Sequence, residues 1–172
     1  MTDYNKLNFS IISYNSQGSG PGKLEYISEL VKNHDLVFLQ EHWLMSNQFG
    51  IYSKHIDDCY SHCISAMSST EIIQGRPYGG CSILWKKDLS ACICPIITVS
   101  KRLCAVTLLM NNVSFLLCNV YMPTGTSASS LEEYRTVLNE IRSIMLNNNC
   151  VYIIIGGDFN TDLNKSGVML PY

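Results

Sequence analysis

The chain opens with two short apolar runs on either side of a stretch with helical periodicity, and this order narrows the possible folds. Leu7 to Asn15 and Leu36 to Gln40 are rich in the β-branched and apolar residues typical of strands. Between them, Lys23 to Asn33 places apolar residues at helical spacing, after the loop-like, Gly- and Pro-containing segment Ser16 to Gly22. The sequence therefore predicts a strand, loop, helix and strand, with the helix crossing between two neighbouring strands.

The middle of the chain changes to strand-like runs separated by short turns. Asn111 and Asn112 stand between two of these runs and predict a hairpin, because asparagine tolerates positive φ. We therefore expect an antiparallel meander over this part of the chain. Its predicted strands are Tyr60 to Met67, Cys81 to Trp85, Ala91 to Val99, Leu103 to Met110 and Val113 to Tyr121.

A second amphipathic helix and one more strand follow. The run Cys150 to Ile155 predicts another buried strand, which ends at Gly156. Strands covered by amphipathic helices indicate a layered α/β or α+β domain. A serine followed three residues later by a glutamate predicts a capping box at the start of the helix, from Ser129 or Ser130 and Glu132 or Glu133. The predicted apolar face of this helix is Leu131, Tyr134, Leu138, Ile141 and Met145.

Composition and charge limit the functional classes. With 172 residues, 47% of them hydrophobic, the chain suits one domain with a substantial core. Its net charge of −2 provides no basic excess for nucleic acid, so a polyanionic substrate would need a bound cation. Met1 to Ser10 is polar and unlike a signal peptide, and no apolar stretch approaches the ~20 residues of a membrane span. These features predict an intracellular protein whose eight cysteines are reduced and pack as small hydrophobes.

Polar side chains stand where several predicted strands end. They are Asn15, Glu41, Tyr121, Asp158 and Asn160. In α/β sheets ligand groups gather at the carboxyl ends of strands. A carboxylate at the end of a buried strand is costly unless it is paired or bound to a cation. Glu41 and Asp158 therefore suggest a Mg²⁺ site and metal-assisted hydrolysis of a phosphoester.

Taken singly, each of these signals also has an ordinary structural explanation, such as a turn or a solvated strand end. His55, Cys59, His62 and Cys63 have a spacing that would suit zinc on a helix, but their segment is predicted to be a strand. The loop Gly18 to Gly22 could place phosphate at a helix N-terminus, yet it lacks the Lys-Ser/Thr of a P-loop. Five basic residues near turns are expected to be solvated, although they could touch a DNA backbone: Arg76, Lys86, Lys87, Lys101 and Arg102.

Five motifs follow one another along the chain. They are Ser13-Tyr14-Asn15, Leu39-Gln40-Glu41, Tyr78-Gly79-Gly80, Asn119-Val120-Tyr121-Met122-Pro123 and Gly156-Gly157-Asp158-Phe159-Asn160. In this order they resemble the endonuclease/exonuclease/phosphatase superfamily, which includes deoxyribonuclease I, apurinic endonucleases, inositol-polyphosphate phosphatases and neutral sphingomyelinases. Two longer segments, Gln40 to Leu44 and Gly75 to Gly80, are most similar to the endonuclease domains of non-LTR retrotransposons. There the domain precedes a reverse transcriptase and nicks target DNA.

The resemblance implies a four-layer α/β sandwich of the deoxyribonuclease I-like type and a divalent cation, Mg²⁺ or Mn²⁺. It implies that Glu41 is the principal metal ligand and that Asn15 assists metal or phosphate binding. Asp158 would position or deprotonate the attacking water, Asn160 would hold the scissile phosphate, and Tyr121 would contact that phosphate. These roles agree with phosphoryl transfer that depends on positioning and charge stabilisation.

The family pattern also includes a terminal Ser-Asp-His, whose Asp and His help to stabilise the transition state. Residues 1–172 contain no such motif, and their histidines lie early, at His34, His42, His55 and His62. We therefore expect one domain over residues 1–172, truncated before that motif and impaired in turnover. The resemblance implies DNA nicking, access to the nucleus and a reverse transcriptase domain in a longer parent protein. A phosphatase or sphingomyelinase-like hydrolase and an inactive remnant are the alternatives.

Overall fold

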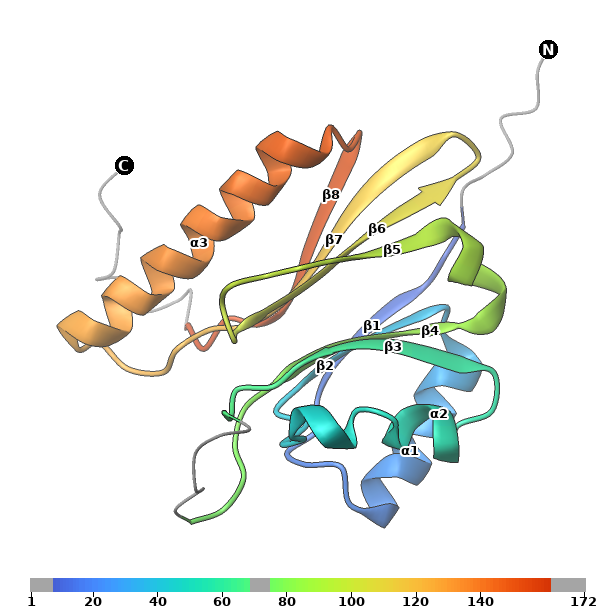
Figure 1. Ribbon diagram of the computed structural model, residues 1–172, viewed down its shortest axis with the longest axis horizontal. Coiled ribbons are helices and arrows are strands. Elements are labelled where there is room, and N and C mark those ends of the chain that lie inside the picture. The colour runs from blue at the N-terminus through green and yellow to red at the C-terminus, as the bar shows by residue number, and fades with distance from the viewer. Residues whose placement is uncertain (1–7, 69–74, 162–172) are drawn as a thin grey trace.

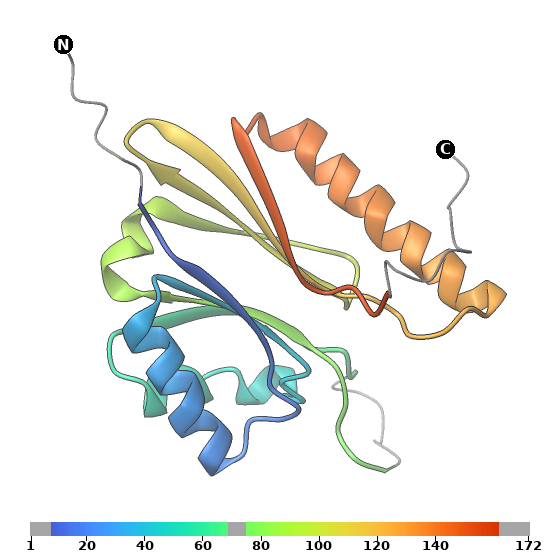
Figure 2. The same ribbon diagram turned by 180° about the vertical axis from the view of Figure 1, so that it is seen from behind.

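Two four-stranded sheets stack face to face between outer helices in the computed structural model, which describes residues 8–68 and 75–161 (Figures 1 and 2). The first sheet has the order β1-β2-β4-β3. Its strands are β1 (Ile11–Asn15), β2 (Leu36–Gln40), β3 (Cys59–Ile64) and β4 (Cys81–Lys86). β1 and β2 are parallel neighbours joined by α1 (Pro21–Asn33), so the predicted opening unit is confirmed.

The second sheet has the order β5-β6-β7-β8. Its strands are β5 (Ile93–Ile96), β6 (Leu103–Met110), β7 (Val113–Tyr121) and β8 (Tyr152–Asp158). β5, β6 and β7 are antiparallel, whereas β8 runs parallel to β7 and is reached through α3 (Ala128–Asn148). The hairpin between β6 and β7 turns at Asn111 and Asn112, with φ of 50° and 61°, which confirms that prediction.

The predicted single meander was wrong, because its strands are divided between the two sheets. β4 is buried along almost its whole length and lies between β2 and β3, the place of a strand covered on both faces. After β4, the 3₁₀ helix η2 (Lys87–Cys92) carries the chain across to the second sheet, so the predicted strand over 91–99 shrinks to β5. The short helices η1 (Ser46–Gln48) and α2 (Ile51–His55) connect β2 to β3.

Three apolar cores hold the four layers together. The first lies between the first sheet and the helices α1 and α2, the second between the two sheets, and the third between the second sheet and α3. Figures 1 and 2 show the same order of layers, with α1 and α2 outside one sheet and α3 outside the other. Central residues of the three cores are Ile27 and Tyr52, Phe38 and Leu117, and Val120 and Ile141, respectively. The arrangement is the predicted four-layer α/β sandwich.

The helix α3 starts earlier than the sequence suggested. Ser127 is the N-cap, and its side chain accepts a hydrogen bond from the backbone N–H of Ser130 at 3.1 Å. Ser129 and Ser130 therefore lie in the first turn, and the predicted capping box is replaced by a simple serine cap. Within the described residues, no helix is long and apolar enough to cross a membrane.

The buried face of α3 and the burial of β8 also differ from expectation. Val137, Ile141 and Ile144 are the buried residues of the helix, whereas Leu138 and Met145 are 38% and 37% exposed. The face therefore lies slightly around the helix from the predicted one. β8 was predicted to be buried, but among the described residues it has one neighbouring strand, and all seven of its residues are exposed or half-buried.

Candidate active site

Three predicted site residues meet where the two sheets come together. Asn15 ends β1, Glu41 follows β2, and Asp158 ends β8 of the other sheet. The side-chain Nδ2 of Asn15 donates to Glu41 Oε1 at 2.8 Å and to Asp158 Oδ2 at 3.1 Å. One amide group therefore links the two carboxylates. Asn15 and Asp158, which it joins across the two sheets, are 143 positions apart in the sequence.

Tyr121 adds a hydroxyl to this group, from the end of β7. Burial raises the pKa of Tyr121 to about 12, and its hydrogen bond with the Glu41 carboxylate and the negative charge there act in the same direction. Tyr121 is also the register partner of Asp158 in the parallel pair β7 and β8. The hydroxyl is therefore protonated at neutral pH and donates its hydrogen to the Glu41 carboxylate.

Asn160 lies beside Asp158. Its backbone N–H donates to Asp158 Oδ1 at 3.0 Å, and its side-chain amide donates to the carbonyl of Met122 at 2.7 Å. The structure thus brings together Asn15, Glu41, Tyr121 and Asp158 and places Asn160 next to them. Their individual roles in metal and phosphate binding stay predictions.

The backbone after β2 turns sharply to present Glu41. Glu41 and Trp43 have φ of 54° and 58°, a conformation that non-glycine residues seldom adopt and that concentrates at functional sites. Their backbone N–H groups donate to the carbonyls of Gly80 and Gly79, both at 2.9 Å. The Leu39-Gln40-Glu41 and Tyr78-Gly79-Gly80 motifs therefore form one local structure, joined by backbone hydrogen bonds.

His42 is buried under that turn. Its Nδ1 accepts the backbone N–H of Leu44 at 2.9 Å, which leaves Nε2 as the donor to the carbonyl of Ile64 at 3.1 Å. Burial lowers the pKa of His42 to about 4, so the ring is neutral at physiological pH. A Cβ at Gly80 would collide with this ring. His42 therefore supports the loop and does not serve the site as an acid.

The glycines of the Gly156 to Asn160 motif allow the two sheets to approach each other. A Cβ on Gly156 would lie 3.1 Å from the ring of Phe38 in the first sheet. Gly157 has φ of 131°, and a Cβ there would collide with the backbone of Val120. Gly156 therefore permits the close approach of the two sheets, and Gly157 permits the close pairing of β8 with β7 just before Asp158.

A buried polar network fixes the sheets just below the site. Asn119 of β7 accepts a hydrogen bond from Gln40 Nε2 at 2.6 Å. The side-chain amide of Asn119 donates to the carbonyls of Leu39 and Ser82 in the first sheet, both at 2.8 Å. The side chains of Asn119 and Gln40 are fully buried, so these bonds have a well-defined geometry.

A cavity of about 210 Å³ opens beside Glu41 and Tyr121. Its walls include Trp43, Arg76 and Arg102, which the sequence-based site did not contain. Arg76 is exposed, as expected, whereas Arg102 is only partly exposed, and both line the cavity. The available signals were the inclusion of Arg76 in the Gly75 to Gly80 segment and the position of Arg102 at the start of a buried strand.

The oxygen-rich donor set fits a hard divalent cation. Glu41 and Asp158 offer carboxylate oxygens, the ligands that Mg²⁺ and Mn²⁺ prefer. Asn15 presents its amide nitrogen to both carboxylates, while its Oδ1, the atom that a cation would bind, accepts the N–H of Gln17 at 3.2 Å. Over residues 8–68 and 75–161, no three His, Cys, Asp or Glu side chains cluster as a metal would need, so this site offers only its two carboxylates.

Other candidate sites have structural explanations. β3 buries Cys59 and Cys63 in the first core and directs His62 to the carbonyl of Ile96 in the second sheet, at 3.2 Å. The loop before α1 packs against the site, since a Cβ on Gly18 would lie 2.9 Å from the Trp43 ring. The eight cysteines are free and five are buried, but Cys94 is exposed, contrary to the expectation for its strand.

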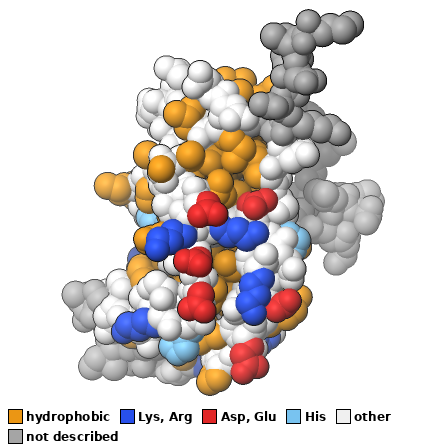
Figure 3. Space-filling view, turned by 90° about the vertical axis from the view of Figure 1, so that its right-hand side faces the viewer, with side chains coloured by type: hydrophobic (Ala, Val, Ile, Leu, Met, Phe, Trp, Pro, Cys, Tyr) orange, Lys and Arg blue, Asp and Glu red, His pale blue; other side chains and the backbone are white. Residues whose placement is uncertain are grey.

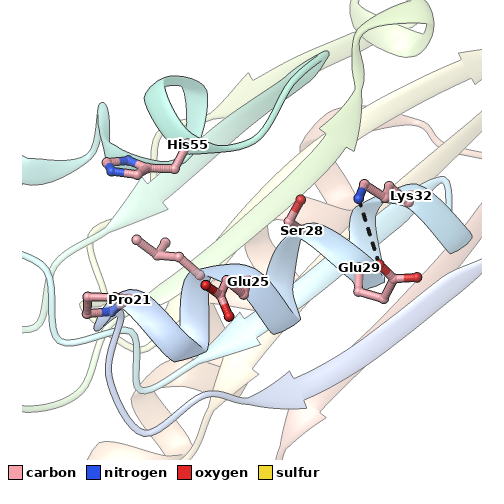
Figure 4. Close-up of a pocket in the computed structure, with 7 residues that line it drawn as sticks. Pro21, Glu25, Ser28, Glu29, Lys32 and His55 are labelled. Atoms are coloured by element: carbon pink, nitrogen blue, oxygen red, sulfur yellow. Dashed lines mark ion pairs between the residues drawn. The ribbon is translucent and has the colours of Figure 1, made fainter.

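A second hollow, of about 450 Å³, lies between α1 and α2 (Figure 4). Its wall on α1 carries Glu29 and Lys32, which form an exposed ion pair at 3.8 Å within one helix. His55 of α2 borders it and directs Nδ1 to the carbonyl of Ile51. Such an exposed pair has little energetic value and offers no catalytic group.

The surface charge is mixed. On the face in Figure 3, basic and acidic side chains alternate, and no patch of a single sign forms. This distribution agrees with the net charge of −2.

The sequence and the fold both match known proteins. Residues 12–171 match the Endonuclease/Exonuclease/phosphatase family. No curated protein matches the sequence significantly. The 3' phosphatase NExo from Neisseria, solved with a product DNA hairpin, shares the fold with a TM-score of 0.63 and 18% identity, over 89% of this chain and 58% of that one.

Two further structures share the fold. The endonuclease domain of TRAS1, a telomere-specific non-LTR retrotransposon, has a TM-score of 0.60 and 14% identity, over 90% of this chain and 62% of that one. A mannosyl-6-phosphatase from Bacteroides thetaiotaomicron has a TM-score of 0.61 and 16% identity, over 90% and 66%. The chain thus spans less than two thirds of each of these structures. Because the family match covers nearly all of the sequence, the chain belongs to the Endonuclease/Exonuclease/phosphatase family.

Proposed function

We propose that this chain carries the metal-binding and water-activating part of a phosphodiesterase that nicks DNA. The observation that supports the proposal most strongly is the Asn15 amide, which holds Glu41 and Asp158 together across the two sheets. Two carboxylates and an amide at strand ends suit a divalent cation and a phosphate group. The family membership and the order of the motifs support the same reaction class.

In this proposal each residue has one task. Glu41, assisted by Asn15, would hold Mg²⁺ or Mn²⁺, and the cation would offset the charge that develops on the phosphoryl oxygens. Asp158 would accept the proton of the attacking water. Tyr121 would turn its hydroxyl hydrogen from Glu41 to a phosphate oxygen, since its raised pKa keeps that hydrogen in place. Asn160 would orient the phosphate through its amide.

The histidines take no part in this scheme. His42 and His62 have pKa values lowered by burial, and both bond to backbone carbonyls. His55 bonds to its own helix and His34 caps α1. We therefore propose that residues 1–172 alone hydrolyse DNA slowly, because no histidine among them replaces the Asp-His pair of the family pattern. A group that stabilises the transition state contributes several powers of ten in rate.

A plasmid-nicking assay tests the proposal. Supercoiled plasmid is incubated with the protein in Mg²⁺ or in chelator, and the open-circular product is measured over time. We expect slow, Mg²⁺-dependent nicking that Glu41→Ala plus Asp158→Ala abolishes. Glu29→Ala, which removes an exposed carboxylate of α1, is the matched control and should nick like the wild type. Equal background nicking by the wild type and the double variant would reject the proposal and favour an inactive remnant.

A phosphatase reaction is the second candidate, because the same fold occurs in a mannosyl-6-phosphatase and in a 3' phosphatase. Release of inorganic phosphate from a sugar phosphate or a 3'-phosphorylated oligonucleotide, without plasmid nicking, would favour it. Release of phosphocholine from sphingomyelin would favour the sphingomyelinase-like alternative. Function beside a reverse transcriptase in a longer protein with access to nuclear DNA belongs to the leading proposal. Sequencing of the reading frame tests that part.

A further inference from the structure

Two arginine–aromatic stacks border the site, one from each sheet. The guanidinium of Arg76 lies over the Trp43 ring, 5.3 Å from its centroid, and that of Arg102 lies over the Tyr121 ring at 5.6 Å. Arg76 precedes β4 of the first sheet, and Arg102 precedes β6 of the second. All four side chains line the same cavity of about 210 Å³.

Both rings also donate a hydrogen bond to the carboxylate of Glu41, the proposed metal ligand. Trp43 Nε1 donates to Glu41 Oε2 at 3.3 Å, and the Tyr121 hydroxyl is hydrogen-bonded to Glu41. Each arginine is therefore held by a ring that is itself fixed on the proposed metal ligand. A planar guanidinium stacked on an aromatic ring retains its outward N–H donors for phosphate oxygens.

Arg102 has additional fixed contacts. Its Nε donates to Glu133 Oε1 at 2.7 Å, and its Nη1 donates to the carbonyl of Tyr121 at 3.2 Å. The side chain is 27% exposed, so part of the guanidinium still faces solvent. Arg76 is exposed and, among the described residues, forms no ion pair that would neutralise it.

We propose that Arg76 and Arg102 bind neighbouring backbone phosphates of a nucleic acid, one on each side of the phosphate at Glu41 and Asp158. The inference rests on the proposed function and specifies its substrate as a chain with several successive phosphates. A chain with a net charge of −2 and a dicarboxylate site repels a polyanion, and the two fixed arginines offset that repulsion where the backbone enters and leaves. A small monophosphate ester offers only one phosphate for the central position.

The dependence of binding on salt measures such contacts directly. Each phosphate contact releases condensed counterions, so the loss of one contact lowers the slope of log Kd against log salt by about one. Binding of a fluorescent DNA duplex is measured in chelator, from about 50 mM to about 200 mM KCl. Wild type is compared with Arg76→Gln, Arg102→Gln and the double variant, and Lys32→Gln is the control for removing one positive charge elsewhere.

We expect each single arginine variant to lower the slope by about one and the double variant by about two. Lys32→Gln should leave the slope unchanged. Arg102 also forms an ion pair with Glu133 of α3, so its substitution could act through that pair. Glu133→Gln breaks the ion pair but keeps Arg102, and it should therefore leave the slope unchanged. Arg102→Lys should keep most of the slope while weakening affinity, because lysine retains the charge without the planar stack.

Slopes that are the same for wild type and both arginine variants would overturn the inference. The outcome is independent of the nicking assay, since binding is measured without cation. Slope changes without nicking would reject the proposed reaction and retain the phosphate contacts. Nicking that depends on Glu41 with unchanged slopes would retain the reaction and reject the contacts. Competition by inorganic phosphate as effective as competition by DNA, per phosphate, would also reject a site for successive phosphates.

Discussion

Gly80 shows at the scale of single residues why a short motif can be so restrictive. Its φ is 91°, and the space where a side chain would begin is filled by the His42 ring. The carbonyl of the same residue accepts the N–H of Glu41. One glycine therefore sets both the position of the buried histidine and the direction of the proposed metal ligand.

Gly80→Ala should lower the free energy of unfolding by more than about 2 kcal/mol, because the substitution combines a strained φ with a collision against the His42 ring. Urea-induced unfolding followed by circular dichroism measures the change. Gly22→Ala is the matched control, since it lies in the first turn of α1 with no atom within 4 Å of the new Cβ, and it should be neutral or stabilising. Similar midpoints for the two variants would contradict this explanation.

The buried histidines make stability depend on pH. The pKa of His42 is lowered from 6.5 to about 4 by burial, so the unfolded chain binds a proton in this range and the folded chain does not. Stability is therefore fully present above about pH 6.5 and decreases as the pH falls towards 4, by up to about 3 kcal/mol. The lowered pKa of His62 acts in the same direction.

Unfolding curves in chelator at several pH values between 4.5 and 7.5 measure this effect. His42→Gln, which has no titrating ring, should show a shallower dependence than the wild type. A wild-type free energy of unfolding that stays constant below pH 6.5 would contradict the neutral, buried state of the ring.

At the scale of elements, the apolar runs predicted the bounds of several strands well. β2, β6 and β7 have the predicted bounds, and the β6–β7 turn is at the predicted asparagines. What failed was the assignment of strands to sheets, because an apolar run does not specify its neighbour. The apolar pattern of β4 suits a meander and a central strand equally, and only the packing against β2 decides between them.

β8 is the element whose burial differs most from the burial that its sequence predicts. Its apolar residues predicted burial, yet Ile153 and Ile155 are 38% and 39% exposed on an edge strand. An unpaired edge with β-branched residues is a template for pairing with another chain. In the part of the chain that the structure describes, no strand pairs with the free edge of β8, so we expect residues 1–172 to associate at high concentration.

Ile155→Lys should reduce that association, because a charged residue on an edge strand opposes strand pairing. Light scattering and sedimentation over a concentration series measure the effect. Leu109→Lys is the matched control, since Leu109 is 54% exposed on β6, which has neighbours on both sides. Equal association of the wild type and Ile155→Lys would show that β8 is not the contact.

At the scale of the whole molecule, the site forms because the two sheets stack so that the ends of β1 and β2 lie beside the ends of β7 and β8. The sequence predicted the site residues from strand ends, and the structure brings Asn15, Glu41, Tyr121 and Asp158 together. The sequence did not predict that Arg76 and Arg102 lie over the rings of Trp43 and Tyr121, because such contacts have no signature in residue spacing. The inter-sheet bonds of Asn119 were likewise invisible, since buried polar pairs have no periodic signature.

Asn119→Ala should destabilise the protein by about 3 kcal/mol or more, because the buried carbonyls of Leu39 and Ser82 lose the Asn119 donor and the Gln40 amide loses its shortest hydrogen bond. Thermal and urea-induced unfolding measure the loss. Asn33→Ala removes an exposed asparagine whose amide bonds within α1, and it should change stability by less than about 0.5 kcal/mol. A similarly small effect of Asn119→Ala would show that this network does not hold the sheets.

The two tryptophans lie in different environments, so their intrinsic fluorescence can report on different parts of the protein. Trp85 is 6% exposed in the core between the sheets, with its Nε1 on Ser90, whereas the Trp43 indole is bonded to Glu41 at the cavity. Emission from Trp85 follows the separation of the sheets, and emission from Trp43 follows events at the carboxylate. In a Trp85→Phe variant, a fluorescence titration with Mg²⁺ would report the site alone, without a label or a substrate.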